Sequence, residues 1–353
     1  MKSFADRIIT WQRQHGRHTL PWQQSRDPYR IWLSEIMLQQ TQVATVVGYY
    51  TRFLDRFPTL DALAAASEDE VLTLWSGLGY YSRARNLHAA ARHIMLSGGV
   101  FPDNAEAMSR LPGIGRSTAA AIAALAYGER NAILDGNVKR VLARHAGIDG
   151  WPGEKDVASR LWACADARLP KRDMATYTQG MMDLGALVCT RTQPGCHACP
   201  VAADCVARTE NRTDSLPAPR PKKSLPHRRI QMLVLHHGHE LLLMKRPGKG
   251  IWGGLWSLPE IDADTDGSNH VTSAWACRVG SQQALPPIVH GFTHFRLHIQ
   301  PQYLNLTHRG EPPPGHVWLP LAACQQAALP APVRRLLSAL PRALFTQASR
   351  ATP

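Results

Sequence analysis

The chain contains no long apolar run. Its 353 residues include no segment approaching a membrane-spanning helix, which needs about 18 consecutive apolar residues. The first residues, MKSFADRIITWQ, lack the apolar stretch of a secretory signal peptide. No internal repeat and no low-complexity tract is present. We therefore expect a soluble, cytoplasmic protein with no membrane partner.

Negative charge is scarce relative to positive charge. The chain has 27 Asp and Glu against 40 Lys and Arg, a formal net charge of +13. This excess predicts a polyanionic partner, although a basic surface without a specific partner is the alternative. Apolar residues at 44% and charged residues at 19% are ordinary for a folded protein and exclude a disordered or collagen-like chain. The length predicts roughly two domains.

The chain divides by pattern into a helical part and a later part rich in short apolar runs. Residues 4–187 repeat apolar side chains at helical spacing, so we expect an all-α N-terminal domain. Residues 213–229 combine prolines with basic residues and predict an extended linker. Short strands are predicted at 230–237, 240–246 and 292–300, as in a small α/β or β-rich domain. The predicted boundaries are 1–212, 213–229 and 230–345.

Cysteine usage does not suit a disulfide framework, because the chain has seven cysteines, an odd number. Cys164, Cys277 and Cys324 stand apart and are interpreted as small apolar residues. The others follow the spacing C-x6-C-x2-C-x5-C, and nearby prolines and a glycine turn the chain back on itself, so that four thiolates can converge. Four cysteine ligands suit either tetrahedral zinc or a [4Fe-4S] cluster. These candidate ligands are Cys189, Cys196, Cys199 and Cys205.

Residues 111–128, LPGIGRSTAAAIAALAYG, predict a glycine-containing turn followed by an Ala-rich helix. Gly113 and Gly115 allow positive φ and a close approach of backbone to ligand, and the first N–H groups of a helix can hold a phosphate. An ordinary helix–helix turn has the same pattern. Arg83, Arg85, Lys139 and Arg140 are candidates for sequence-independent phosphate contacts or for solvated surface charges.

Two carboxylates lie beside predicted helices. Asp135 immediately precedes the amphipathic segment of ILDGNVKRVLAR (133–144), where an N-cap stabilises a helix by about 1 kcal/mol. Glu35 lies in IWLSEIMLQQTQVATVV (31–47), beside Ile36 and Leu38. These apolar neighbours predict partial burial, which would raise the carboxyl pKa and keep a proton available near neutrality. On residue type alone, an N-cap and a helix-surface glutamate are the ordinary interpretations.

These segments together resemble the endonuclease III and MutY superfamily of helix-hairpin-helix DNA glycosylases, over nearly the whole chain. The cysteine spacing matches its iron–sulfur loop, and residues 31–47 resemble the MutY branch, which removes adenine mispaired with 8-oxoguanine. The resemblance implies an N-terminal all-α helix-hairpin-helix glycosylase fold with a [4Fe-4S] loop at 189–205. It also implies a nucleoid-associated monomer that acts on A:8-oxoguanine or A:G mispairs in double-stranded DNA.

The resemblance further implies roles for individual residues. Glu35 corresponds to the general acid, Asp135 to the carboxylate that stabilises the sugar cation, and Asn137 to a residue that orients the site. Ser117 stands where strand-cleaving relatives carry a lysine that forms a Schiff base, so a monofunctional enzyme that leaves an abasic site is expected. The family's DNA contacts fall on Gln40 (a wedge), Thr41, Tyr80 (its stacking partner), Gly113, Gly115, Ser117 and Gln179 (facing the flipped adenine).

The C-terminal part resembles the Nudix-like α/β domain attached to this branch, through LLLMKRPGKGIWGGLWSLPE (241–260). After Glu260 the run of metal-binding glutamates of a working Nudix hydrolase is missing, so nucleotide hydrolysis is not expected. HGFTHFRLHI (290–299) resembles the family's Phe-Ser-His hairpin tip that senses 8-oxoguanine. The corresponding residues are Phe292, Thr293 and His294, and Thr293 keeps the hydroxyl of the serine that it replaces.

Three other functions remain open on the sequence. An endonuclease III-like lyase is disfavoured by Ser117 and by the C-terminal domain. A DNA-binding protein without catalysis is disfavoured by the two carboxylate motifs, and an active Nudix hydrolase by the missing glutamates.

Overall fold

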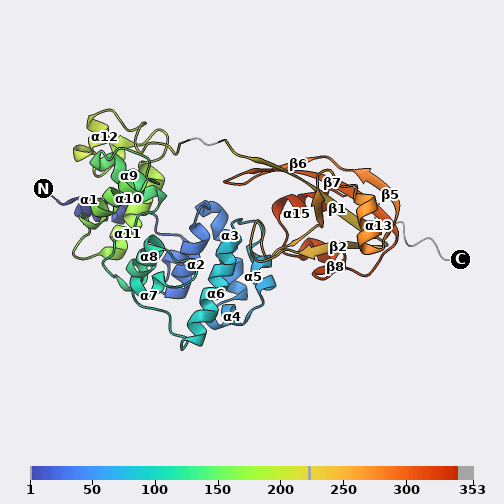
Figure 1. Ribbon diagram of the computed structural model, residues 1–353. Helices are drawn as coiled ribbons and strands as arrows, with labels where there is room; N and C mark the ends of the chain where they lie inside the picture. The colour runs from blue at the N-terminus through green and yellow to red at the C-terminus, as the bar shows by residue number, and fades with distance from the viewer. Residues whose placement is uncertain (1, 222–223, 341–353) are drawn as a thin grey trace. The chain divides into compact units, whose positions relative to one another are not determined.

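The computed structural model describes residues 2–221 and 224–340, and the chain divides into two compact units (Figure 1). The first unit comprises Met1–Ala65 and Asn86–Lys222, and the second comprises Ala66–Arg85 and Lys223–Pro353. A short segment from the N-terminal half thus packs with the C-terminal part. Residues 222, 223 and 341–345 of the predicted linker and C-terminal domain lie outside the described residues, and the predicted boundaries stay predictions.

The first unit is helical throughout its described residues, as the apolar spacing predicts. Its elements, with α6 continuing from the second unit, are α1 (Phe4–His15), η1 (Pro21–Gln23), α2 (Pro28–Leu38), α3 (Val43–Arg56), α4 (Leu60–Ala65), α6 (Ser82–Leu96), α7 (Ala105–Ser109), α8 (Arg116–Tyr127), α9 (Gly136–Ala146), α10 (Lys155–Asp166), α11 (Met174–Asp183), η2 (Leu184–Val188), η3 (Cys196–Ala198), η4 (Ala202–Asp204) and α12 (Val206–Thr209).

A shared core packs α1, α8, α9, α10 and α11 against one another. Ile8, Leu142 and Leu161 are fully buried in it. Fully burying such side chains contributes roughly 1.5–3 kcal/mol each. The core therefore fixes the start of α9, where Asp135 lies, relative to α8 and α11.

The predicted turn before α8 is a close approach of backbone to a neighbouring helix. Gly113 has φ +77°, and a Cβ there would lie 2.7 Å from Cβ of Asn86. A larger residue would be strained in its backbone and would also clash, which explains the glycine. Gly115 is the N-cap of α8, and α7, the turn and α8 together form the predicted helix-hairpin-helix.

The second unit contains an eight-stranded mixed sheet with the order β3-β2-β1-β7-β5, in which β1 and β7 run parallel. Three further strands pair off this path: β4 with β1, β6 with β7 and β8 with β2. The strands are β1 (His227–His237), β2 (Glu240–Lys245), β3 (Trp256–Ser257), β4 (Glu260–Asp262), β5 (Arg278–Ala284), β6 (Ile288–Gly291), β7 (Arg296–His308) and β8 (His316–Pro320).

Two details of this sheet differ from the prediction. The first strand begins at His227, inside the segment predicted as linker, because its backbone pairs with the start of β7. The strand predicted at 292–300 begins only at Arg296. The residues before it form the turn of the β6–β7 hairpin, which the N–H of Phe292 closes by donating to the carbonyl of Phe295 at 2.9 Å.

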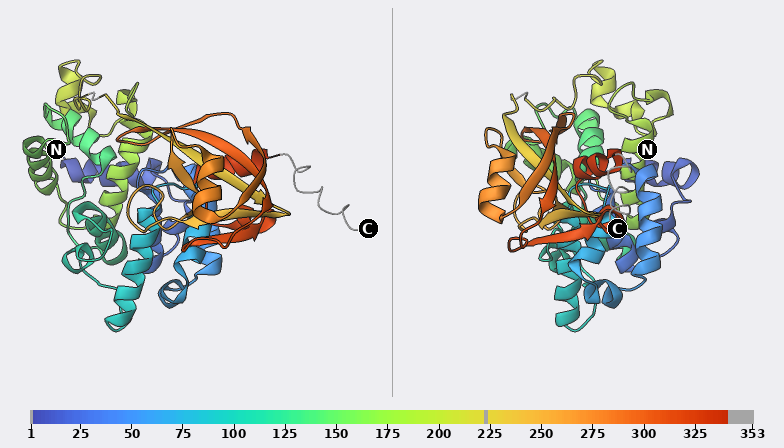
Figure 2. Two further views of the ribbon diagram at one scale, coloured as in Figure 1. Left: turned by 45° about the vertical axis from the view of Figure 1, so that its right-hand side comes forward. Right: turned by 90° about the vertical axis from the view of Figure 1, so that its right-hand side faces the viewer.

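Helices cover both faces of the sheet. Figure 2 shows α13 (Gly267–Trp275) and α15 (Ala331–Ala339) on opposite faces. Val271 of α13 packs on Leu233 and Leu304 in a core cluster. The unit also includes α14 (Leu321–Gln326) and α5 (Glu68–Trp75). The hydroxyls of Ser76 and Tyr81, which follow α5, donate to the carbonyl of Leu329 at 3.3 and 3.5 Å. These bonds attach the N-terminal segment to the C-terminal part.

No helix of the described residues is both long enough and apolar enough to cross a membrane.

Candidate functional site

Two carboxylates that are far apart in the sequence interact in the first unit. Glu35 lies in α2 and Asp135 precedes α9. Burial raises the pKa of Glu35 to about 7, and the negative charge of Asp135 adds to the rise. The direction is the one that the apolar neighbours of Glu35 predict. The two predicted catalytic carboxylates are therefore close enough to interact electrostatically, which the sequence alone did not establish.

Asp135 has a structural role at the same place. Its backbone is extended, and its carboxylate accepts a hydrogen bond from the N–H of Val138 at 2.7 Å, as an N-cap does. Burial raises the pKa of Asp135, while the N–H groups of Val138 and Asn137 and the charges of Arg140 and Lys139 oppose that rise. The cap orients the carboxylate without removing it from the site.

Two partly buried carboxyl groups that interact in this way can differ in protonation near neutral pH. The first ionisation is assisted by the N–H donors around Asp135, and the second is opposed by the charge already present. At neutral pH one group can therefore donate a proton while the other remains an anion. Such a pair suits cleavage of a bond whose leaving group needs a proton and whose other half becomes cationic.

The raised pKa of Glu35 predicts a pH-dependent contribution to stability. Its pKa is about 7 in the folded chain against an ordinary value of 4.5, so the folded state binds the proton more tightly. The stabilising contribution of this proton is then fully present below pH 4.5 and is lost as the pH rises through about 7. Glu35→Gln lacks this loss. The free energy of unfolding of the variant, relative to that of wild type, should therefore be higher above pH 7 than at pH 4 by roughly 1–3 kcal/mol.

Urea unfolding of wild type and Glu35→Gln at pH 4 and pH 8 measures this difference. Glu106→Gln is the matched control, since Glu106 is exposed and forms an ion pair with Arg110, four residues further along the chain. A Glu35→Gln effect of equal size at both pH values would contradict the raised pKa.

Ser117 and Asn137 lie beside the carboxylates. The hydroxyl of Ser117 in α8 accepts a hydrogen bond from the N–H of Leu134, the residue before Asp135, at 2.9 Å. The side-chain oxygen of Asn137 accepts from Arg140 at 2.8 Å, and a Cβ on Gly185 would lie 2.6 Å from Cβ of Asn137. Position 117 is thus adjacent to Asp135, and Asn137 packs tightly against η2.

The end of α2 carries a second group of predicted residues. The amide of Gln39 donates to the hydroxyl of Thr118 at 3.3 Å, which ties this end of α2 to α8. Gln40 follows, exposed and with φ 58°, and the N–H of Thr41 donates to the carbonyl of Leu38 at 3.3 Å. Positive φ is uncommon for a non-glycine residue and clusters at functional sites. The strained turn presents Gln40 to solvent.

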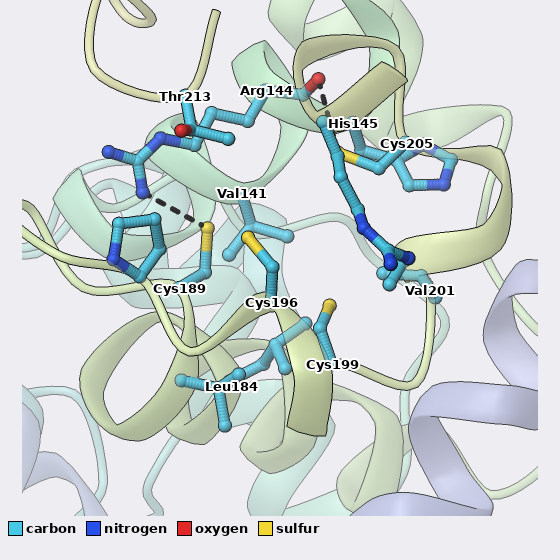
Figure 3. A pocket seen from close by; sticks show the side chains of 14 residues that line it. Val141, Arg144, His145, Leu184, Cys189, Cys196, Cys199, Val201, Cys205 and Thr213 are labelled. Carbon is cyan, nitrogen blue, oxygen red and sulfur yellow. Dashed lines mark hydrogen bonds between the residues drawn. The ribbon is translucent and has the colours of Figure 1, made fainter. Parts of the chain in front are cut away.

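The four clustered cysteines line one pocket with a cavity of about 30 Å³. Their sulfur atoms point toward a common space between α9, η2 and the loop that follows (Figure 3). Burial raises the pKa of Cys199 to about 11, and the charges of the other three thiols add to the rise. Among the described residues, no three His, Cys, Asp or Glu side chains are gathered closely enough to hold a metal ion as they stand. The donor set nonetheless fits a thiophilic metal centre.

Two arginines of α9 donate hydrogen bonds to the chain segments around this pocket. The sequence analysis assigned Arg140 to a phosphate contact or to solvent, and it did not consider Arg144. Arg140 donates to the carbonyls of Cys189 and Gly185 at 2.7 and 2.6 Å, so it is committed inside the protein and is not an exposed phosphate contact. Arg144 is buried and donates to the sulfur of Cys189 at 3.4 Å and to the carbonyl of Thr190 at 2.6 Å. Its spacing of four from Arg140, one helical turn, was the available signal.

Gln179 is held within α11, where its amide donates to the buried carboxylate of Asp183 at 3.0 Å. Arg17 forms an ion pair with the same carboxylate at 2.6 Å. These contacts do not join Gln179 to Glu35 or Asp135, so its role opposite a flipped base stays a prediction.

The other predicted DNA contacts lie in the second unit. Tyr80 is 46% exposed and has φ 48°, the same unusual backbone region as Gln40. Trp75 donates to the carbonyl of Gly79 at 3.2 Å, and the buried Arg83 donates to the carbonyls of Leu78 and Gly79 at 3.2 and 3.1 Å. Arg83 therefore supports the Tyr80 turn from inside and is not an exposed phosphate contact.

The β6–β7 hairpin presents the remaining predicted residues. Phe292 stacks on the buried Phe295 with ring centroids 4.6 Å apart. Thr293 and His294 are exposed at the tip, and the hydroxyl of the first lies 3.4 Å from Nδ1 of the second. The hairpin turn thus packs the Phe292 ring on the buried Phe295 and exposes the side chains of Thr293 and His294.

Known proteins share this combination of units. Residues 33–166 match the HhH-GPD superfamily of base excision DNA repair proteins, and residues 230–339 match the NUDIX domain. An adenine DNA glycosylase of Buchnera aphidicola (subsp. Acyrthosiphon pisum) is 34% identical, over 97% of this chain and 99% of that protein. The chain belongs to the adenine DNA glycosylase family. The human adenine DNA glycosylase is 33% identical, over 95% of this chain and 73% of its own length.

Solved structures agree with this family in the fold of the helical part. A thermostable thymine-DNA glycosylase has a TM-score of 0.53 and 29% identity, covering 59% of this chain and 95% of that chain. Endonuclease III in a non-covalent complex with DNA has a TM-score of 0.50 and 21% identity, covering 59% of this chain and 94% of that chain. The prediction of an endonuclease III-like helical fold followed by a Nudix domain is confirmed.

Proposed function

We propose that this DNA glycosylase of base excision repair hydrolyses the N-glycosidic bond of adenine mispaired with 8-oxoguanine or guanine in duplex DNA. The observation that carries the proposal is the partly buried, electrostatically interacting pair Glu35 and Asp135, in a chain of the adenine DNA glycosylase family. The product is an abasic site in an unbroken strand.

The pair supplies the two charges that the reaction needs. Glu35 keeps a proton near neutral pH and donates it to N7 of adenine, which makes the base a better leaving group. Asp135, held as an anion by the N–H of Val138, lies against the sugar as positive charge develops at C1′. Asn137, fixed by Arg140, orients the site.

Strand cleavage through a Schiff base needs an amine, which Ser117 lacks. Its hydroxyl accepts from the N–H of Leu134, so position 117 is adjacent to Asp135 without offering a nucleophilic nitrogen. This favours a monofunctional glycosylase over an endonuclease III-like lyase. The absence of any Glu in α13, GSNHVTSAW, likewise disfavours nucleotide hydrolysis by the Nudix domain.

In this proposal exposed residues hold and open the duplex. The first N–H groups of α8, after Gly113 and Gly115, bind a phosphate, while Gln40 enters the base stack and Tyr80 stacks on the opened step. Extruding the adenine costs a few kcal/mol and costs less at a mispair. Thr41 and Gln179 complete the contacts to the opened strand in this proposal.

Strand scission with and without hot alkali tests the activity. Excess protein is mixed with a duplex that holds one adenine opposite 8-oxoguanine, and the adenine strand is followed with time. Scission only after alkali supports base removal without lyase activity. Scission without alkali would instead indicate a lyase, and an intact strand under both treatments, with DNA bound, would indicate a binding protein without catalysis.

The four cysteines hold a [4Fe-4S] cluster in this proposal, supported by their convergence on one pocket. When bound, such a cluster cross-links four points of the loop 189–205 through iron–thiolate bonds. Arg144 then donates to the Cys189 sulfur and to the carbonyl of Thr190, which anchors the loop to α9.

Cys199→Ser should abolish the visible thiolate-to-iron absorbance of the purified protein and lower its melting temperature. Wild type should contain iron and acid-labile sulfide in equal amounts. Cys164→Ser is the matched control, because Cys164 lies outside the pocket and should keep full absorbance. Zinc without iron in protein purified anaerobically would contradict the cluster and support a tetrahedral zinc site.

The hairpin tip reads the lesion in this proposal, through the exposed hydroxyl of Thr293. Thr293→Val keeps the shape and removes the hydroxyl. We expect the ratio of excision rates opposite 8-oxoguanine and opposite guanine to fall by about tenfold, the size of one lost hydrogen bond to a polar base edge. Thr293→Ser should keep the ratio, and an unchanged ratio in Thr293→Val would remove the hydroxyl from lesion recognition.

A further inference from the structure

The loop of residues 247–255, which joins β2 to β3, is buried in its second half. Pro247 to Gly250 are exposed, whereas Trp252 to Leu255 are buried. Trp252 is only 8% exposed and has φ 54°, a strained conformation for a bulky residue. Strain of this kind persists only where the surroundings enforce it. We call residues 247–255 the Trp252 loop.

One side of the Trp252 loop supports the lesion-reading hairpin. The indole lies 5.5 Å from the His290 ring and 5.4 Å from the Phe292 ring, between centroids. His290 and Phe292 also contact each other edge-on at 4.8 Å. Phe292 is therefore held between Trp252 and Phe295, and the exposed tip at Thr293 begins directly after it.

The other side of the loop contacts the segment that carries Tyr80. The guanidinium of Arg85 donates to the carbonyl of Gly253. Gly254 has φ +77°, and a Cβ there would lie 2.9 Å from Oε1 of Glu68 and 3.3 Å from Cδ1 of Leu72. The loop backbone thus packs directly on α5 and on the start of α6, the two helices that flank the Tyr80 turn.

Internal contacts make the loop stiff enough to connect these two sides. The guanidinium of Arg246 forms an ion pair with Glu260, donates to the carbonyl of Ile251 at 3.1 Å and lies 5.5 Å from the centroid of the Trp252 ring. The N–H of Arg246 donates to the carbonyl of Leu255 at 2.9 Å, which closes the loop at its base.

We propose that Trp252 is a positioning residue that couples lesion reading at Thr293 to the stacking of Tyr80. Contact of the hairpin tip with 8-oxoguanine fixes the Phe292 ring against Trp252. The Trp252 loop transmits this restraint to the Tyr80 turn through the hydrogen bond from Arg85 to the carbonyl of Gly253. The inference rests on the proposed roles of the hairpin and Tyr80, and it adds a residue that contacts neither DNA nor the reacting atoms.

Three single variants test the role of the indole in single-turnover excision at saturating protein. Trp252→Ala should lower the ratio of rates opposite 8-oxoguanine and guanine by about tenfold, by reducing only the 8-oxoguanine rate. Trp252→Phe should restore most of the ratio, because a ring still packs on Phe292. Trp275→Ala is the same truncation on α13, where the ring contacts His270 and, on β8, His316, and it should leave the ratio unchanged.

The coupling to Tyr80 needs its own measurement. Arg85→Met should lower the ratio, and Arg85→Met combined with Trp252→Ala should lose little beyond Trp252→Ala alone, since both act on one path. The fluorescence of 2-aminopurine placed beside 8-oxoguanine increases when the base step unstacks. Trp252→Ala should reduce that increase on the 8-oxoguanine duplex and leave it unchanged on the guanine duplex.

The results separate this inference from the proposed function. A wild type that excises adenine opposite neither base would overturn the proposed function itself, and a wild type without preference for 8-oxoguanine would overturn lesion reading by the hairpin and the positioning role of Trp252 with it. A wild-type preference that survives in Trp252→Ala would overturn the positioning role, and multiplicative losses in the double variant would overturn the coupling to Tyr80.

Discussion

Glu35→Gln should abolish adenine excision while leaving DNA binding intact. Gln keeps the size of the side chain and cannot donate an acidic proton, so the single-turnover rate should fall by about 10²–10⁴-fold, the usual contribution of a general acid. Binding of the A:8-oxoguanine duplex, measured by fluorescence anisotropy at fixed salt, should stay within about twofold because no phosphate contact changes. Undiminished turnover would remove Glu35 from the mechanism.

The pH dependence of the wild-type rate gives an independent check on Glu35. Since burial raises its pKa to about 7, the protonated acid should predominate below pH 7 and disappear above it. The excision rate should therefore fall with rising pH, by about tenfold for each unit well above 7. Glu106→Gln, at an exposed position, should reproduce the wild-type profile. A rate that is level from pH 6 to 9 would contradict an acid with this pKa.

The sequence predicted the burial of Glu35 and the capping role of Asp135 better than it predicted that the two carboxylates interact. The apolar neighbours of Glu35 predict its burial, and the position of Asp135 before a helix predicts its cap, because both depend on a few adjacent residues. Their electrostatic interaction depends on how α2, α8 and α9 pack, which no local pattern encodes. Family resemblance supplied that pairing, and the structure supplied its physical cause.

Charge was the property that the sequence predicted least well. Arg83, Arg140 and Arg144 belong to the large positive excess, yet each donates to backbone carbonyls inside the protein. A basic residue in a basic chain suggests a phosphate contact. Only the packed structure shows that it instead donates to backbone carbonyls inside the protein. The grouping of Ala66–Arg85 with the C-terminal part was likewise missed, because its evidence is a set of long-range contacts such as Ser76 with Leu329.

Asp135→Asn should separate the two roles of Asp135. Asn is also a good N-cap, and its side-chain oxygen can still accept from the N–H of Val138, so the melting temperature should change little. The negative charge against the sugar is lost, and the single-turnover rate should fall by at least about 10²–10³-fold. Circular dichroism and thermal unfolding report the fold, and alkali-dependent scission reports the chemistry.

Asp266→Asn is a matched control for this substitution. Asp266 caps α13, where it accepts from the N–H of Asn269 at 2.8 Å, so the same change is made at the same kind of cap and leaves both members of the carboxyl pair in place. It should leave excision unchanged. Loss of fold together with activity in Asp135→Asn would mean that capping alone explains the residue.

Asp135→Asn also changes the environment of Glu35 in a way that can be measured. Removing the neighbouring negative charge lowers the pKa of Glu35, but only in part, because burial is the larger cause of its rise. The loss of stability between pH 4 and pH 8 that is attributed to Glu35 should therefore shrink in Asp135→Asn without vanishing. An unchanged loss would mean that the charge of Asp135 does not raise the pKa of Glu35, and the proposed roles of Glu35 as acid and Asp135 as anion would then lack their electrostatic basis.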